Sequence, residues 1–402
     1  MQILFLHDNF PAQFGVLGQY LAKKGWDVWF GTQRKGAQLE GLKTFNYAPH
    51  REVTEKIHPY VGGFEKAVLN GQGLARAALK LKSKGLKPDI VMAHSGWGPG
   101  LYVKDVWPKT RYVGYFEWYY RSNAPDIAFL DEASREIDDD LRTRTRNASI
   151  QMDLISCDAA WCPTHFQHSQ FPDLLKEKLT VIHDGIDTAT YAPSPGAKLQ
   201  LDALDLSGVD ELITYVARGM EPYRGFPDFM KALEIVLAKK PNARAVIVGE
   251  DRVAYGKKLP NGESFKQQAL KERNLDLDRI HFTGLLPRGE YLKVLKASSV
   301  HVYLTIPFVL SWSMMEAMST GCAIVCSKTP PVDEMAGLDA PTIKQADHRK
   351  PEVLAEAIVS LLENREEASQ LGANARRFIL DHYAMKDIFS KKEAMLKSLV
   401  AS

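Results

Sequence analysis

The chain has 402 residues, of which 45% are hydrophobic and 25% are charged, with a formal net charge of +2. This length suggests two domains, because a single hydrophobic core stops growing at about 250–300 residues. The proportions are those of a folded soluble protein, and the near-neutral net charge gives no sign of a nucleic-acid binder. We therefore expect no nucleic acid among the partners.

Neither an export signal nor a membrane span is expected. The first ten residues, MQILFLHDNF, contain an apolar run too short for a signal peptide and carry no basic leader. No apolar stretch approaches the roughly 20 residues of a transmembrane helix. The four cysteines, Cys157, Cys162, Cys322 and Cys326, lie in or beside expected buried strands, where Cys behaves as a small hydrophobe. Reduced thiols in the cytoplasm are the simplest account.

Short apolar runs alternate with segments of helical period, which is typical of parallel sheets covered by helices. A first series of strands is expected at residues 3–6, 28–30, 90–93, 112–116, 159–162 and 181–182. A second series is expected at residues 212–216, 245–248, 280–282, 300–304 and 323–326. The pattern predicts an α/β chain of two Rossmann-like domains in tandem.

The domain boundaries follow from composition. We expect an N-terminal domain over residues 1–188 and a C-terminal domain over residues 209–385. Between them, residues 189–208 are rich in Pro, Ser and Gly with little periodicity, which is typical of a linker. An amphipathic helix at about 386–402 follows a break near 381–386, and we expect it to cross back to the first domain.

Two strand ends in the first half carry candidate cleft residues, because ligands of open α/β sheets bind outside the carboxyl ends of the strands. His94 follows the strand at 90–93 and stands beside glycines, which allow close approach of a ligand. Glu117 follows the strand at 112–116 and is a carboxylate amid aromatic residues. The turn after the first strand lacks a glycine-rich dinucleotide fingerprint.

In the second half, Arg218 and Arg224 lie on either side of a turn that opens a helix after Gly225. Two guanidinium groups at a helix start suit a pyrophosphate, because Arg stays charged and donates in a fork that matches phosphate oxygens. A pair of solvated surface arginines is the alternative. The residues that follow the next two strands could wall a nucleotide base or form ordinary loops. They are Gly249, Glu250, Leu285 and Leu286.

Residues 310–321, with the sequence LSWSMMEAMSTG, carry the strongest functional signal. They follow an expected strand and begin a helix whose first N–H groups would point out of the carboxyl end of that strand. Unpaired donors and the helix dipole predict an anion site there. Gly321 supplies the left-handed residue that ends the helix. A capping box formed by Ser313 and Glu316 is the alternative, and this segment alone leaves both open.

Together these segments resemble the retaining family-4 glycosyltransferases of the GT-B fold, and the similarity extends over most of the chain. The matching pieces, in order, are His94, residues 181–187, the Arg218–Gly225 turn, residues 246–249, residues 282–284 and residues 313–321. The resemblance implies two Rossmann-like domains facing across a cleft. It also implies a nucleotide-sugar donor, UDP- or GDP-linked, held mainly by the C-terminal domain, and transfer with retention of configuration. No metal and no cofactor are expected.

Carried over residue by residue, the resemblance implies that Arg218 and Arg224 hold the donor diphosphate, with Gly225 at their turn. Glu316 would accept hydrogen bonds from the ribose hydroxyls, and His94 would contact the transferred sugar. The backbone N–H groups at the helix start would meet the phosphates and the sugar. These groups belong to Ser311, Trp312 and Ser313.

The largest departure from the family lies at Phe308, where the family has another Glu, eight positions before Glu316, that engages the donor sugar. Either another polar group, in part Ser311, binds the sugar in a different subfamily, or the site is degenerate. We favour the first explanation because the helix-start anion site is kept. The glycine-rich loop of many relatives is also replaced, here by residues 10–15 (FPAQFG), so acceptor recognition is expected to differ.

Departure of a nucleoside diphosphate builds negative charge on its phosphate oxygens, and fixed positive donors there lower the barrier most. Glu117 is the candidate for orienting or deprotonating the acceptor hydroxyl, and a structural ion pair is an equal alternative. The ligand-like spacing of Cys162, His165 and His168 is discounted as a metal site because no fourth ligand is near. The basic stretch 66–87 could lean on anionic lipid or be a solvated helix face.

Three hypotheses of different class follow. The leading one is a cytoplasmic glycosyltransferase, free or peripheral at the inner face of the membrane, that extends a glycan or lipid-linked glycan in polysaccharide or glycoconjugate synthesis. The second is a nonhydrolysing sugar-nucleotide epimerase on the same fold, which would need no acceptor. The third is a catalytically silent sugar-nucleotide or glycan binding protein, for which Phe308 is the best argument.

Overall fold

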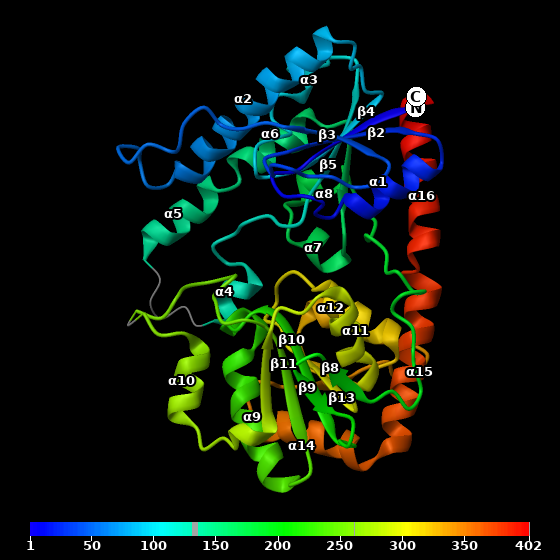
Figure 1. Cartoon of the computed structure of the whole chain (residues 1–402). Helices are drawn as coiled ribbons and strands as arrows, with labels where there is room; N and C mark the ends of the chain where they lie inside the picture. Colours follow the sequence, from blue (N-terminus) through cyan, green and yellow to red (C-terminus); the bar gives the residue numbers. More distant parts are fainter. Residues whose placement is uncertain (131–135, 261, 402) are drawn as a thin grey trace. The chain divides into compact units, whose positions relative to one another are not determined.

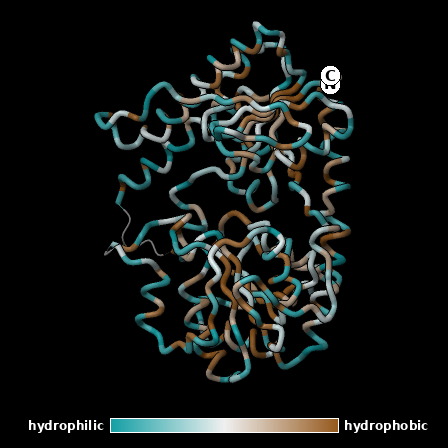
Figure 2. Tube along the Cα trace, in the orientation of Figure 1, coloured by the Kyte–Doolittle hydropathy of each residue, from teal (hydrophilic) through white to brown (hydrophobic). Residues whose placement is uncertain are grey.

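The computed structural model describes residues 1–130, 136–260 and 262–401. The chain divides into two compact units, Met1–Asp184 with Lys386–Ser402, and Gly185–Met385. Figure 1 shows that each unit is built on a sheet covered by helices. The hydrophobic residues concentrate along the sheet strands of each unit (Figure 2). The prediction of two Rossmann-like α/β domains is confirmed.

The first unit contains a seven-stranded sheet with the order β3-β2-β1-β4-β5-β6-β7, in which every pair is parallel. Its strands are β1 (Gln2–Leu6), β2 (Asp27–Thr32), β3 (Leu42–Asn46), β4 (Ile90–His94), β5 (Arg111–Tyr115), β6 (Ala159–Cys162) and β7 (Leu179–Val181). The apolar runs predicted every strand except β3. This edge strand has no buried residue, so it carries no apolar run.

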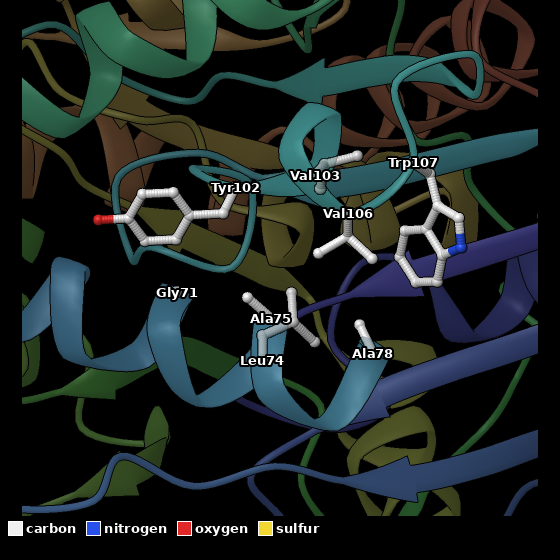
Figure 3. A pocket seen from close by; sticks show the side chains of 8 residues that line it. All are labelled: Gly71, Leu74, Ala75, Ala78, Tyr102, Val103, Val106 and Trp107. Carbon is white, nitrogen blue, oxygen red and sulfur yellow. The ribbon is translucent and has the colours of Figure 1, made fainter. Parts of the chain in front are cut away.

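Nine helices of the described chain belong to this unit. They are α1 (Gly15–Lys23), α2 (Gly62–Ser83), α3 (Val103–Val106), α4 (Pro125–Phe129), α5 (Ile137–Thr145), α6 (Ala148–Ser156), α7 (His165–Ser169), α8 (Asp173–Lys176) and α16 (Met385–Ala401). Figure 3 shows α2 facing α3 across an apolar seam, with Leu74 and Ala78 opposite Val106 and Trp107. The seam has no room for a water-sized molecule, so it is helix packing and offers no ligand site.

The second unit contains a six-stranded parallel sheet with the order β12-β11-β10-β13-β14-β15, and a separate antiparallel pair, β8 with β9. The strands are β8 (Leu199–Leu201), β9 (Leu204–Leu206), β10 (Leu212–Gly219), β11 (Arg244–Glu250), β12 (Ile280–Gly284), β13 (Val300–Tyr303), β14 (Ile324–Ser327) and β15 (Lys344–Ala346). This hairpin lies inside the segment expected as a linker. The segment forms strands because Leu199, Leu201 and Leu206 bury their side chains in a small apolar cluster.

Helices of the second unit surround a core centred on α9, where Tyr215 and Phe229 stack with ring centroids 4.7 Å apart. They are η1 (Pro222–Arg224), α9 (Phe226–Lys239), α10 (Phe265–Glu272), η2 (Leu277–Arg279), α11 (Arg288–Ala297), α12 (Trp312–Thr320), α13 (Pro330–Asp333), α14 (Pro351–Glu363) and α15 (Arg365–His382). Within the described ranges, no helix is both long and apolar enough to cross a membrane. All four cysteines are buried and free of disulfides.

The C-terminal helix α16 packs on the first unit, as the sequence predicted. The Tyr20 hydroxyl donates to Glu393 Oε2 at 3.0 Å, and its ring lies 5.4 Å from that of Phe389. Deeper in the contact, Lys392 Nζ lies 3.2 Å from Asp184 Oδ1, with side chains only 2% and 9% exposed. The Asp184 carboxylate also accepts from the Tyr115 hydroxyl at 2.7 Å. A buried ion pair therefore ties the helix to the end of the first unit.

Replacing Lys392 with Ala is expected to lower the free energy of unfolding by about 3–5 kcal/mol, because Asp184 is left as a buried charge without its cation. Lys397→Ala is the matched control on the same helix. The Lys397 side chain is 56% exposed, and its ammonium pairs with Glu393 at 2.7 Å. An ion pair at the surface contributes about 0–1 kcal/mol. Urea denaturation of both variants measures the difference, and equal small losses would contradict the expected cost.

Candidate functional site

The carboxyl ends of four neighbouring strands meet at one edge of the second sheet. Gly219 at the end of β10 pairs with Glu250 at the end of β11, and Val248 of β11 pairs with Gly284 at the end of β12. On the other side of β10 lies β13, which leads into the turn before α12. The residues expected to bind the donor therefore come from one edge of the second sheet. They are Arg218, Arg224, Gly249, Glu250 and the first residues of α12.

The two arginines of the β10 turn differ in their surroundings. Arg218 is exposed, whereas Arg224 is only 6% exposed. Arg224 Nη1 donates to Tyr303 Oη at 3.3 Å, to Thr305 Oγ1 at 3.0 Å and to the Val309 carbonyl at 3.0 Å. All three acceptors are neutral oxygens of β13 and the turn that follows it. Arg224 therefore braces the turn before α12, while Arg218 presents a guanidinium to solvent.

The N-terminus of α12 is capped by Ser311, whose Oγ accepts from Ser313 N at 3.3 Å and lies 2.9 Å from Ser313 Oγ. The capping-box hypothesis for Ser313 and Glu316 is wrong, because Ser311 is the N-cap and Glu316 lies beyond the first turn. Trp312, the first helical residue, is 41% exposed. Gly321 ends the helix at a φ of 80°, as predicted.

The Glu316 carboxylate lies beside residues that the sequence did not indicate as its neighbours. Its Oε2 accepts from the Tyr291 hydroxyl on α11 at 2.8 Å, and the Tyr191 hydroxyl lies near the carboxylate. Burial raises the pKa of Glu316, and the two tyrosine hydroxyls and Arg288 oppose that rise. Tyr191 lies in the segment expected as a linker, and Tyr291 lies on a helix that no strong periodicity marked.

A cavity of about 410 Å³ lies beside the ends of β11 and β12. Its lining residues are Met220, Gly249, Glu250, Asp251, Arg252, Lys266, Phe282 and Gly284. Gly249 and Glu250, the residues proposed from the sequence as a base wall, thus both line this cavity. Leu285 and Leu286 do not line this cavity, because Leu285 is 60% exposed and Leu286 packs into the cluster of the β8–β9 hairpin.

Phe308 lies at the tip of the turn braced by Arg224. Its ring centroid is 5.1 Å from that of Tyr223 and 5.3 Å from that of Tyr255, both edge to face. Arg224 in turn faces the Tyr255 ring at 5.4 Å. The position that carries a carboxylate in the family is therefore part of an aromatic wall in this chain.

In the first unit, His94 and Glu117 come together at the ends of adjacent strands β4 and β5. His94 Nδ1 lies 2.9 Å from the Ser95 carbonyl, to which it donates, and Nε2 lies 3.3 Å from Glu117 Oε2. Glu117 Oε1 accepts from Gln13 Nε2 at 2.7 Å. Burial alone would lower the pKa of His94, but the Glu117 carboxylate, the Ser95 carbonyl and Asp184 together outweigh burial and raise it.

Two further residues of this cluster were not assigned a role from the sequence. The His7 ring lies 4.9 Å from that of His94, and its pKa is lowered to about 3 by burial and by the charge of His94. His7 is therefore neutral near pH 7 and packs beside His94. Gln13 is the second, and it fixes the orientation of Glu117. Both lie after β1, at a strand end without a glycine-rich turn.

Two other sequence patterns have structural explanations. The aromatic cluster around Glu117 is largely core, since Tyr115, Trp118 and Tyr119 are 1%, 7% and 8% exposed. Thr164 caps α7 by accepting from Gln167 N at 3.1 Å, so the segment with metal-like spacing begins a helix. Over the described ranges, no three His, Cys, Asp or Glu side chains are grouped closely enough to hold a metal ion.

Two Rossmann-like units in one chain, each a parallel sheet covered by helices, are the architecture of the GT-B class of proteins. The family "Glycosyl transferase family 4 group" matches residues 24–191, and "Glycosyl transferases group 1" matches residues 201–378. The chain therefore belongs to the group 1, family-4 glycosyltransferases.

Individual relatives are distant. The uncharacterized glycosyltransferase MJ1069 of Methanocaldococcus jannaschii is 26% identical over 181 residues, 44% of this chain and 43% of that protein. The match thus spans less than half of this curated relative. Sucrose-phosphate synthase of Thermosynechococcus elongatus superposes with a TM-score of 0.73 at 17% identity, covering 100% of this chain and 99% of that one. Anabaena HepE, solved with UDP-glucose, gives 0.71 at 15% identity, covering 99% and 100%. These two similarities show the fold.

Proposed function

We propose that the protein transfers a sugar from a nucleoside-diphosphate sugar to a glycan or glycolipid acceptor, with retention of configuration and without a metal ion. The observation that carries the proposal is the set of groups at one edge of the second sheet. An exposed Arg218, the capped N-terminus of α12 and the Glu316 carboxylate all come from that edge. A cation, a helix N-terminus and a carboxylate are the partners that a diphosphate and a ribose need.

Each group has a distinct task in this proposal. Arg218 and the N–H groups of Ser311 to Ser313 neutralise the charge that develops on the leaving diphosphate. Arg224 keeps the turn between β13 and α12 in place. Glu316 accepts from the ribose hydroxyls, and the 410 Å³ cavity beside Gly249 and Glu250 takes the base. The UDP-glucose complex of HepE supports a sugar nucleotide as donor.

The acceptor is assigned to the first unit, where Glu117 would orient or deprotonate the acceptor hydroxyl beside His94. Glu117 keeps 32% of its side chain exposed, so a hydroxyl can reach it, whereas His94 keeps only 6%. Gln13 and His94 together fix the direction of the carboxylate. We assign the enzyme to polysaccharide or glycoconjugate synthesis in the cytoplasm, free or peripheral at the membrane.

A second candidate, a catalytically silent sugar-nucleotide binding protein, is favoured by one observation. The aromatic wall of Phe308, Tyr223 and Tyr255 stands where a sugar-binding carboxylate is expected. A binding protein would hold the nucleotide without transferring its sugar.

Calorimetric titration of the full-length protein in a chelator, against UDP, GDP, ADP and dTDP and then their common sugar conjugates, tests the proposal. Selective binding of one diphosphate would support the donor site and identify the base. No binding of any diphosphate would contradict the proposed function. Binding of a sugar nucleotide without transfer to any glycan, glycolipid or water would favour the silent protein.

A further inference from the structure

Two tyrosine side chains from separate segments hold the carboxylate of Glu316. Tyr291 on α11 donates to Glu316 Oε2 at 2.8 Å, and the Tyr191 hydroxyl lies near the same carboxylate. The two rings lie edge to face with centroids 6.2 Å apart. We propose that Tyr291 and Tyr191 are positioning residues that aim Glu316 at the vicinal hydroxyls of the donor ribose. This inference rests on the proposed function, in which Glu316 binds the ribose.

The backbone of Tyr191 is itself anchored to α12 and α15. The Tyr191 carbonyl accepts from Ser319 Oγ at 2.6 Å and from Arg376 Nη1 at 2.7 Å. The whole residue is only 5% exposed. Ser319 lies one turn beyond Glu316 on the same helix. Tyr191 is therefore registered against the helix that carries the carboxylate, and its hydroxyl meets Glu316 at a fixed place.

Tyr291 is anchored from the other side. It lies in the first turns of α11 and packs against the apolar cluster that includes Met315 and Ala317, the residues flanking Glu316. Figure 1 shows α11 and α12 adjacent in the second unit. Both tyrosine rings thus pack against residues of α12, the helix that carries Glu316. The Glu316 carboxylate therefore has little rotational freedom.

The hydrogen-bonding capacity of the carboxylate fits a diol. An ionised carboxylate has about four lone-pair sites, and the Tyr291 hydroxyl occupies one of them. Burial and the neighbouring charge of Glu316 raise the pKa of both phenols, so each keeps its proton and donates. Arg288 stands over the Tyr191 ring at 5.3 Å and pairs with Asp187 at 3.2 Å. Glu316 therefore keeps acceptor positions for the two hydroxyls of a ribose.

A purely structural role would give a different result. If the Tyr291–Glu316 bond only fastens α11 to α12, its loss would lower stability but would affect ribose and 2′-deoxyribose ligands alike. If it aims the carboxylate, its loss would reduce the preference for ribose. The ratio of two dissociation constants therefore separates positioning from fastening, because any general loosening of the site cancels in that ratio.

The experiment is calorimetric titration of the full-length protein with UDP, GDP and ADP, followed by the 2′-deoxy form of the tightest ligand. The wild-type protein is expected to bind the ribose form roughly tenfold more tightly, the effect of one hydrogen bond to a charged group. Glu316→Gln is expected to remove most of this preference. Tyr291→Phe is expected to reduce it to about threefold or less, and addition of Tyr191→Phe to abolish it.

Tyr20→Phe is the matched control. It removes a hydroxyl that donates to a carboxylate, Glu393 Oε2, at 3.0 Å in the first unit, and it should leave the ribose preference unchanged. A full preference in Tyr291→Phe, with loss of the preference in Glu316→Gln, would overturn the inference and leave the donor site standing. A lower melting temperature in Tyr291→Phe with an unchanged ratio would also overturn it. Failure of the wild-type protein to bind any diphosphate would overturn the proposed function itself.

Discussion

Arg218→Ala is expected to weaken binding of the donor diphosphate by about 10–100-fold, the loss of a charge-assisted hydrogen bond, while the melting temperature stays unchanged. The side chain of Arg218 is exposed at the end of β10, so no core contact depends on it. Calorimetry gives the affinity and thermal unfolding gives the stability of the same preparation. Unchanged affinity would remove Arg218 from the donor site.

Arg224→Ala serves as the contrast, because it is expected to lose both affinity and stability. Arg224 is 6% exposed and donates to Tyr303, Thr305 and the Val309 carbonyl. Its removal leaves these buried acceptors unsatisfied, at a cost of about 1–3 kcal/mol for such a group. From the sequence, both arginines are predicted to bind the diphosphate in the same way. Equal stability losses in both variants would contradict the division of tasks described above.

Glu117→Gln is expected to lower the rate of sugar transfer by about 100-fold or more, the usual contribution of a general base, while donor affinity stays unchanged. The amide keeps the shape of the side chain, but it cannot accept a proton from the acceptor hydroxyl. It also removes the negative charge that faces His94 Nε2 at 3.3 Å. Steady-state transfer assays and calorimetry with the same donor separate the two effects. A loss of donor affinity equal to the loss of rate would contradict the assignment of Glu117 to the acceptor.

The pH dependence of stability provides a control for this variant. In the wild-type protein burial lowers the pKa of His94, but Glu117, with the Ser95 carbonyl and Asp184, raises it above its ordinary value of 6.5. The ion pair therefore stabilises the fold fully below that ordinary value, and its contribution is lost as the pH rises through the raised pKa. The difference in free energy of unfolding between wild type and Glu117→Gln should be largest below about pH 6.5 and should shrink above it. A constant difference would show that His94 does not titrate against Glu117.

The central strands could be predicted from the sequence because burial on both faces demands a continuous apolar run, as in residues 90–93 and 245–248. The strands that escaped prediction are edge or hairpin strands. Lys344–Ala346 and Leu42–Asn46 each expose part of their length, so polar residues interrupt the pattern. The hairpin Leu199–Leu206 was hidden by its position in a segment of linker composition.

The candidate site was predictable where neighbours are fixed by strand order. His94 and Glu117 follow strands that pair in the sheet, so strand ends alone bring them to one edge. The burial of Arg224 was not predictable, because its acceptors lie about 80 residues further along the chain. Tyr291, the partner of Glu316 on α11, was not predictable either, because side-chain hydrogen bonds between helices leave no periodic pattern in the sequence.

The brace formed by Arg224 has a thermodynamic consequence. Its bonds to Thr305 and Val309, with that of Ser311 N to Tyr303 Oη at 2.8 Å, hold the turn before α12 with the protein's own atoms. An incoming anion therefore does not have to order this loop, and the entropic penalty of about 1–2 kcal/mol per ordered residue is met during folding instead. Association at this edge should accordingly be fast and rigid, with little change in heat capacity from loop closure.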